Sequence, residues 1–111
     1  MIDGSALAKA EAMKRRTKQF ALRVLRLWRA LPKNDEGRII GRQLLRSGTS
    51  VGANYRAVCR ARSRREFASK MNVVLEEADE TAFWIELLIE GGVVRAGVAP
   101  PPAAVRMQQI G

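Results

Sequence analysis

Apolar residues recur at helical spacing along three long stretches of this 111-residue chain. In the first stretch, Phe20, Val24 and Leu27 lie on one face when each residue advances by about 100°. This pattern predicts an amphipathic helix over about residues 6–31. Pro32 follows it and cannot continue a helical hydrogen-bond ladder.

The second stretch, about residues 36–62, keeps a helical apolar period although Gly41, Gly48 and Gly52 lie inside it. Each glycine costs a helix about 1 kcal/mol relative to alanine, so we expect a contact that compensates for them. The three glycines fall within about 40° of the helix surface and form a groove for a neighbouring helix. The alternative is a helix broken at Gly48, with Ser50 capping a second segment. The unbroken apolar period favours the continuous helix.

The third stretch begins with the spacing of a capping box, Ser63 followed by Glu66, and predicts a helix over about residues 64–90. Gly91 and Gly92 then end that helix.

Residues 1–95 are therefore expected to form one helical domain, followed by the tail 96–111. Three consecutive prolines leave this tail room for only a stub of a fourth helix. The predicted fold is all-α, an up-down helical bundle of the four-helix type whose fourth helix is truncated or missing.

Residues 44–54, Leu-Leu-Arg-Ser-Gly-Thr-Ser-Val-Gly-Ala-Asn, resemble the signature of a bacterial four-helix-bundle family named after 23S rRNA intervening-sequence proteins. The resemblance extends over about residues 17–94. It implies a four-helix fold and a homo-oligomer, with a pentamer favoured. It also implies a relationship to the accessory protein of diversity-generating retroelements, a basic bundle that works with a reverse transcriptase and RNA. Six residues are expected to serve helix packing: Gly41, Ser47, Gly48, Ser50, Gly52 and Asn54. The amide of Asn54 is expected to bridge two helices.

Charge is distributed unevenly along the chain. There are 20 Lys and Arg residues, 11 Asp and Glu residues and no His, for a net charge of +9. Residues 1–70 hold 18 basic and 5 acidic side chains, whereas residues 71–111 hold 2 and 6. A strongly basic half indicates a polyanionic partner, most often nucleic acid. One Cys fits a reducing compartment, and no apolar run approaches the length of a membrane span, so we expect a cytoplasmic protein.

Six arginines fall within about 80° of one another if the second helix is continuous. We call them the arginine stripe: Arg38, Arg42, Arg46, Arg56, Arg60 and Arg64. Guanidinium groups pair well with phosphate oxygens, so the stripe predicts non-sequence-specific binding of nucleic acid, with RNA favoured, by an oligomeric accessory factor. The alternative is a structural or protein-interaction module, whose stripe pairs with the acidic third helix or an acidic protein partner.

The sequence offers little for catalysis. Without His, the usual triads and imidazole metal sites cannot form, and most acids of the third helix point away from its apolar face. We therefore expect no enzyme activity, metal, cofactor or small-molecule substrate. Cys59 is expected to be a buried small residue. The missing helix is expected to expose apolar side chains and to favour self-association. The residues expected on that surface are Leu22, Leu25, Trp84 and Leu88.

Overall fold

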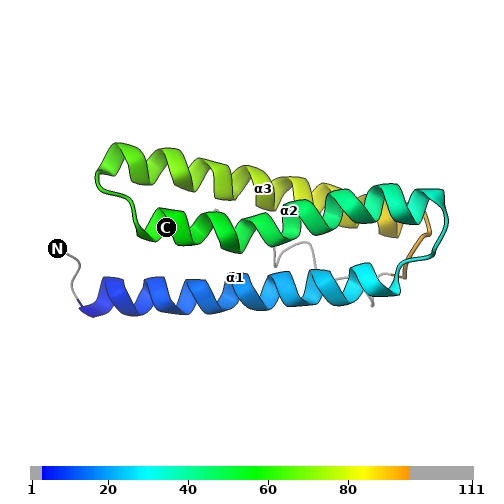
Figure 1. Ribbon diagram of the computed structural model, residues 1–111, viewed down its shortest axis with the longest axis horizontal. Coiled ribbons are helices and arrows are strands. Elements are labelled where there is room, and N and C mark those ends of the chain that lie inside the picture. Colours follow the sequence, from blue (N-terminus) through cyan, green and yellow to red (C-terminus); the bar gives the residue numbers. More distant parts are fainter. Residues whose placement is uncertain (1–3, 96–111) are drawn as a thin grey trace.

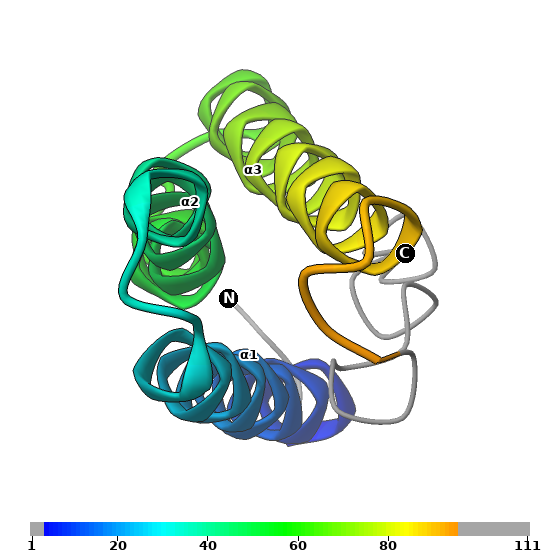
Figure 2. The same ribbon diagram turned by 90° about the vertical axis from the view of Figure 1, so that its right-hand side faces the viewer.

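The computed structural model describes residues 4–95, and within them the fold is all-α, with three helices. These are α1 (Gly4–Ala30), α2 (Asp35–Cys59) and α3 (Arg64–Glu90). Consecutive helices run in opposite directions, joined by short turns at opposite ends of the molecule (Figure 1). Seen along the helices, α2 lies between α1 and α3 and packs against both (Figure 2). The predicted stub of a fourth helix in residues 96–111 lies outside the described residues.

Local capping sets where the helices begin and end. The Asn34 side chain accepts a hydrogen bond from the Gly37 N–H at 2.9 Å and caps α2. The Ser63 hydroxyl accepts one from the Glu66 N–H at 3.0 Å and caps α3, as the capping box predicts. At the end of α3, Gly92 adopts a φ of 74°, a conformation that favours glycine.

The second helix ends three residues earlier than predicted. The Arg60 and Ala61 N–H groups donate to the carbonyls of Ala57 and Val58, at 3.1 and 3.0 Å. These bonds span three residues instead of four, so the last turn tightens and α2 stops at Cys59. Arg60 is then the C-cap residue of α2 rather than part of its interior.

The core lies along the inner faces of the three helices. Its fully buried apolar side chains come from all of them: Val24, Leu44, Val51, Val74, Ile85 and Leu88. Leu88 was expected on an exposed apolar surface, and this expectation is wrong because the side chain is 0% exposed. Leu22 is exposed as expected, while Leu25 and Trp84 are half-buried.

The α2 helix continues through its glycines, and α1 lies against them. A Cβ atom built at Gly48 would lie 2.7 Å from a methyl group of Val24, and one at Gly41 would lie 2.8 Å from Leu31 Cδ1. Gly52 has more room, because its Cβ would lie 3.4 Å from atoms of Thr17. The absence of side chains at Gly41 and Gly48 therefore allows α1 to approach the α2 backbone.

Gly37, which was not singled out from the sequence, has even less room for a side chain than Gly41 and Gly48. A Cβ atom at Gly37 would lie 2.1 Å from the backbone oxygen of Pro32. The turn between α1 and α2 therefore folds directly over the first turn of α2. The Pro and Asn that precede Gly37 were the available signal, since both favour turns.

Hydroxyl groups join α2 to α3 on its other side. Ser47 Oγ and Thr81 Oγ1 lie 2.8 Å apart, and both residues are 0% exposed. Asn54 does not form the predicted bridge between helices. Its amide instead donates to the Ser50 carbonyl of the same helix at 2.9 Å, and the Ser50 hydroxyl donates one turn back to Arg46 O at 2.6 Å.

Candidate nucleic-acid interface

The arginine stripe is divided by the structure. Arg38, Arg42, Arg46 and Arg56 lie on α2, Arg60 caps it, and Arg64 is the first residue of α3. The predicted continuous row of six on one helix is therefore wrong, because α2 ends before it reaches Arg64. The capping box at Ser63 was the signal that already separated Arg64 from the second helix.

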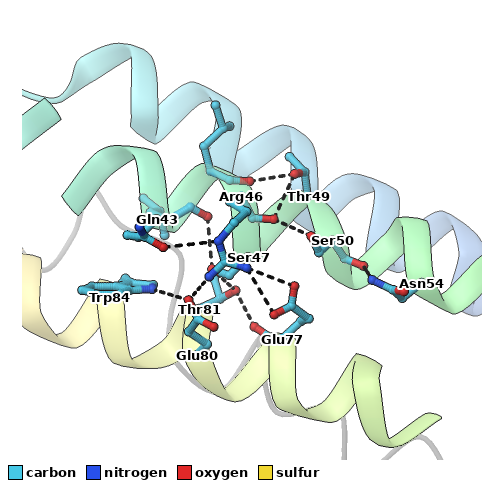
Figure 3. Close-up of polar contacts among 12 residues, drawn as sticks. Gln43, Arg46, Ser47, Thr49, Ser50, Asn54, Glu77, Glu80, Thr81 and Trp84 are labelled. Carbon is cyan, nitrogen blue, oxygen red and sulfur yellow. Dashed lines mark hydrogen bonds and ion pairs between the residues drawn. The ribbon is translucent and has the colours of Figure 1, made fainter. Parts of the chain in front are cut away.

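Arg46 is held by the neighbouring helix. Its Nη1 lies 3.4 Å from Glu77 Oε2, and its Nη2 is hydrogen bonded to Glu80 Oε2 (Figure 3). Its Nε donates to the side-chain oxygen of Gln43 at 3.2 Å. Trp84 Nε1 donates to the same Glu80 oxygen at 3.0 Å. These contacts occupy the guanidinium with groups of its own chain, which makes Arg46 a poor phosphate ligand.

The remaining α2 arginines differ from one another. Arg38 pairs with Asp35 at 2.9 Å and also donates to the Lys33 carbonyl. Arg42 and Arg56 are exposed and form no ion pair with any residue of the described range 4–95. Only these two arginines of the helix proper therefore have unoccupied guanidiniums.

The highest local density of exposed arginine lies at the turn from α2 to α3. We call these five residues the turn cluster: Arg56, Arg60, Arg62, Arg64 and Arg65. Within the part of the chain that the structure describes, their single ion pair is a long one, 3.6 Å from Arg62 Nε to Glu66 Oε2. In Figure 1 this turn lies at the same end of the bundle as the start of α1.

Two members of the turn cluster, Arg62 and Arg65, were missed by the sequence reasoning, which considered only one helical face. A turn brings together residues from two helices regardless of their helical phase. The signal was the local run Arg-Ala-Arg-Ser-Arg-Arg over residues 60–65, with five basic and no acidic side chains between Arg56 and Arg65.

One exposed aromatic side chain accompanies these arginines: Phe67, in the first turn of α3, is 49% exposed. Tyr55 is buried, and desolvation together with the neighbouring Cys59 raises its pKa to about 12. Trp28 is partly exposed, but it lies near the opposite end of α1 with Lys33 Nζ 5.9 Å from its ring. The arrangement is therefore suited mainly to phosphate contacts, with Phe67 as the exposed ring beside it on which a base could stack.

Other chemistry has little support in this region. Cys59 beside the turn is half-buried and packs against the core. Among residues 4–95, no three His, Cys, Asp or Glu side chains are grouped so that they could hold a metal ion. Over the same range, no helix has both the length and the apolar character needed to cross a membrane.

Comparisons with known proteins identify a matching family model and a similar solved structure. The model of a family described as 23S rRNA-intervening sequence protein matches residues 10–98, which include most of α1 and all of α2 and α3. Among solved structures, the chain is similar to a protein of unknown function from the S23 ribosomal protein family of Bacteroides thetaiotaomicron. The two chains are 35% identical with a TM-score of 0.77, over 92% of this chain and 90% of that one. A comparison with curated proteins finds no significant match.

Proposed function

Because the chain belongs to the 23S rRNA-intervening sequence protein family, we propose that it is a non-catalytic cytoplasmic protein that binds nucleic acid, with RNA preferred. The observation that carries this proposal is the turn cluster, five exposed arginines with one carboxylate contact in the described part of the chain. Guanidinium groups pair with phosphate oxygens in two parallel hydrogen bonds, and a cluster of them attracts a polyanion. The description of the family as 23S rRNA-intervening sequence protein supports RNA as the ligand.

The binding is proposed to be independent of sequence. Phosphate contacts position a nucleic acid without reading its bases, and stacking of a base on the exposed Phe67 beside the turn cluster would tolerate any sequence. Of the arginine stripe, this proposal keeps Arg42, Arg56, Arg60 and Arg64, since Arg46 and Arg38 have carboxylate partners. Arg64 remains in the site, but as part of the turn.

We also propose that the protein acts as a homo-oligomeric accessory factor. Large apolar side chains on the outer faces of two helices support self-association, among them Leu22 on α1 and Phe83 and Leu87 on α3. The pentamer expected from the family resemblance is one closed form of such an assembly.

The competing proposal is a structural or protein-interaction module. It is favoured by Arg46, whose contacts with Glu77 and Glu80 are those expected if basic residues of α2 serve to hold α3. In this view the turn cluster is a solvated surface, and it binds RNA no better than other basic parts of the molecule.

A matched pair of triple variants separates the two proposals. The first changes Arg60, Arg64 and Arg65 to Gln, and the second changes Arg23, Lys33 and Arg95, which are also exposed but lie outside the turn. Both remove three positive charges. Binding of a single-stranded RNA and of the DNA with the same sequence is measured by fluorescence anisotropy at several salt concentrations.

We expect the turn variant to lose most of its affinity and the control to lose little. Each phosphate contact adds roughly −0.7 to the slope of log affinity against log salt for single strands, so the slope should become shallower by about 2 in the turn variant. Equal losses in the two variants would contradict a localised site, and would make the protein-interaction module the better proposal. Equal affinity for RNA and DNA would remove the RNA preference alone.

A further inference from the structure

The outer face of α3 carries exposed acidic and apolar residues. Six exposed residues form what we call the acidic patch: Glu76, Asp79, Phe83, Glu86, Leu87 and Glu90. They fall within about 100° on the helix surface. Phe83 is 53% exposed and Leu87 is 40% exposed. In the described part of the chain, none of the four acids of this patch forms an ion pair.

The outer face of α1 has the opposite charge. Five exposed residues form what we call the basic patch: Arg15, Lys18, Leu22, Arg26 and Arg29. They fall within about 80° on the helix surface, with Leu22 in the middle. None of the four cations forms an ion pair with another residue of the described range.

The two patches match in length and spacing. Arg15 to Arg29 and Glu76 to Glu90 each cover 14 residue steps, about 21 Å along a helix. Leu22 stands seven residues from each end of the basic patch, and Phe83 stands seven residues from each end of the acidic patch. Both follow the three- and four-residue spacing that keeps side chains on the seam between two packed helices. Each has a central apolar residue with charges of one sign around it.

The two patches cannot meet within one chain. Val24 and Ile85 are fully buried, so the inner faces of α1 and α3 point into the core and the two patches point outward. Figure 2 shows α1 and α3 on different sides of the molecule. A contact between an acidic patch and a basic patch therefore requires two copies of the chain.

We infer that the acidic patch on α3 of one copy binds the basic patch on α1 of a second copy. A second copy of the chain fits the acidic patch because its basic patch has the opposite charge, the same length and an apolar residue at its centre. The contact joins two different surfaces, so repeating it closes a ring or extends a filament. The inference rests on the proposed self-association and specifies its surfaces. It leaves the turn cluster free, because no residue of that cluster belongs to either patch.

Charge reversal of each patch tests the pairing. The first variant carries Glu86→Lys and Glu90→Lys on α3, and the second carries Arg26→Glu and Arg29→Glu on α1. Two controls make the same charge changes at exposed positions outside both patches, Asp35→Lys with Glu36→Lys, and Arg64→Glu with Arg65→Glu. All proteins are treated with nuclease, checked for helicity by circular dichroism, and analysed by sedimentation velocity at low and high salt.

We expect the wild type and both controls to sediment as multiples of the 12.3 kDa chain at low salt and to dissociate as salt rises. Each patch variant should sediment mainly as a single chain, since two of the four charges in the changed patch are reversed and its net charge falls to zero. A 1:1 mixture of the two patch variants should reassemble, because each then offers the charge that the other lacks. A folding defect in either variant would not be repaired by mixing.

The outcomes distinguish this inference from the proposals on which it rests. Assembly of either patch variant alone, as well as the wild type does, would overturn the pairing of α3 with α1 but leave self-association intact. A wild type that remains a single chain at micromolar concentration would overturn self-association and the pairing together. Neither result bears on RNA binding, which is measured on the turn variant.

Discussion

The middle of α2 and the turn that follows it contain similar residues in contrasting surroundings. Around Ser47, residues of α2 contact both neighbouring helices: Arg46 bonds to acids of α3, and Gly48 lies against Val24 of α1. At the turn, Arg64 and its neighbours are exposed to solvent. Arg46 therefore serves the bundle while Arg64 remains available to a ligand, although they are the same residue type. The neighbouring helix, rather than the residue type, decides between structure and binding.

The largest change in stability is expected when Gly48, in the middle of α2, is replaced by alanine. In a free helix, alanine is favoured over glycine by about 1 kcal/mol. At Gly48, however, the added Cβ would lie 2.7 and 2.8 Å from the two methyl groups of Val24. Val24 is β-branched and fully buried, so it has no free rotamer to adopt. We expect Gly48→Ala to lower the free energy of unfolding by about 2 kcal/mol, the usual size of an overpacking cost.

Gly52→Ala is the matched control for that substitution. Its Cβ would meet Thr17 at 3.4 Å, an ordinary contact, so we expect it to be neutral or to stabilise the protein by up to about 1 kcal/mol. Urea unfolding of both variants measures the difference. If both substitutions stabilise the protein, close approach of α1 is not what requires glycine at residue 48.

A smaller loss of stability is expected when the hydrogen bond between the Ser47 and Thr81 hydroxyls, which joins α2 to α3, is removed. Thr81→Val keeps the shape of the side chain but leaves the buried Ser47 hydroxyl with only the distant Leu44 carbonyl, at 3.4 Å. We expect a loss of about 1–2 kcal/mol, the cost of a buried polar group without a good partner. The double variant Ser47→Ala with Thr81→Val should lose less than the sum of the single variants.

The control for this pair is Thr49→Val, because Thr49 is exposed and bonds only to carbonyls of its own helix. It should change the free energy of unfolding by less than about 0.5 kcal/mol. Strict additivity of Ser47→Ala and Thr81→Val in urea unfolding would show that the two hydroxyls do not interact.

The smallest change in stability is expected for Arg46→Gln, and comparing it with Arg64→Gln tests the different roles of the two arginines. Arg46→Gln breaks contacts that are partly exposed to water, so we expect a loss of about 0.5–1 kcal/mol at low salt and less at 1 M salt. Arg64→Gln should alter stability by less than about 0.5 kcal/mol. In RNA binding the order should reverse, with Arg64→Gln weaker than Arg46→Gln. The opposite order in RNA binding would place Arg46 in the site and contradict its structural assignment.

Much of the architecture could be read from the sequence, because it depends on local patterns. Apolar period, Pro32 and the capping box at Ser63 predict three helices within a few residues of their bounds. The apolar period also predicts that α2 runs through Gly48, since a helix keeps its core face in phase despite a glycine. The end of α2 was less predictable, because it depends on a change from four-residue to three-residue hydrogen bonding over the last turn.

The candidate site could be predicted only in part, because some ion pairs join residues that are far apart in the sequence. Composition and spacing determined that the first 70 residues are basic and that arginines gather on and after the second helix. They could not show which guanidiniums are occupied, because an ion pair such as Arg46 with Glu80 joins residues 34 positions apart. That contact depends on the side-by-side packing of α2 and α3. Helical phase and local charge are properties of the sequence, whereas the pairing of Arg46 with acids of another helix follows from the tertiary structure alone.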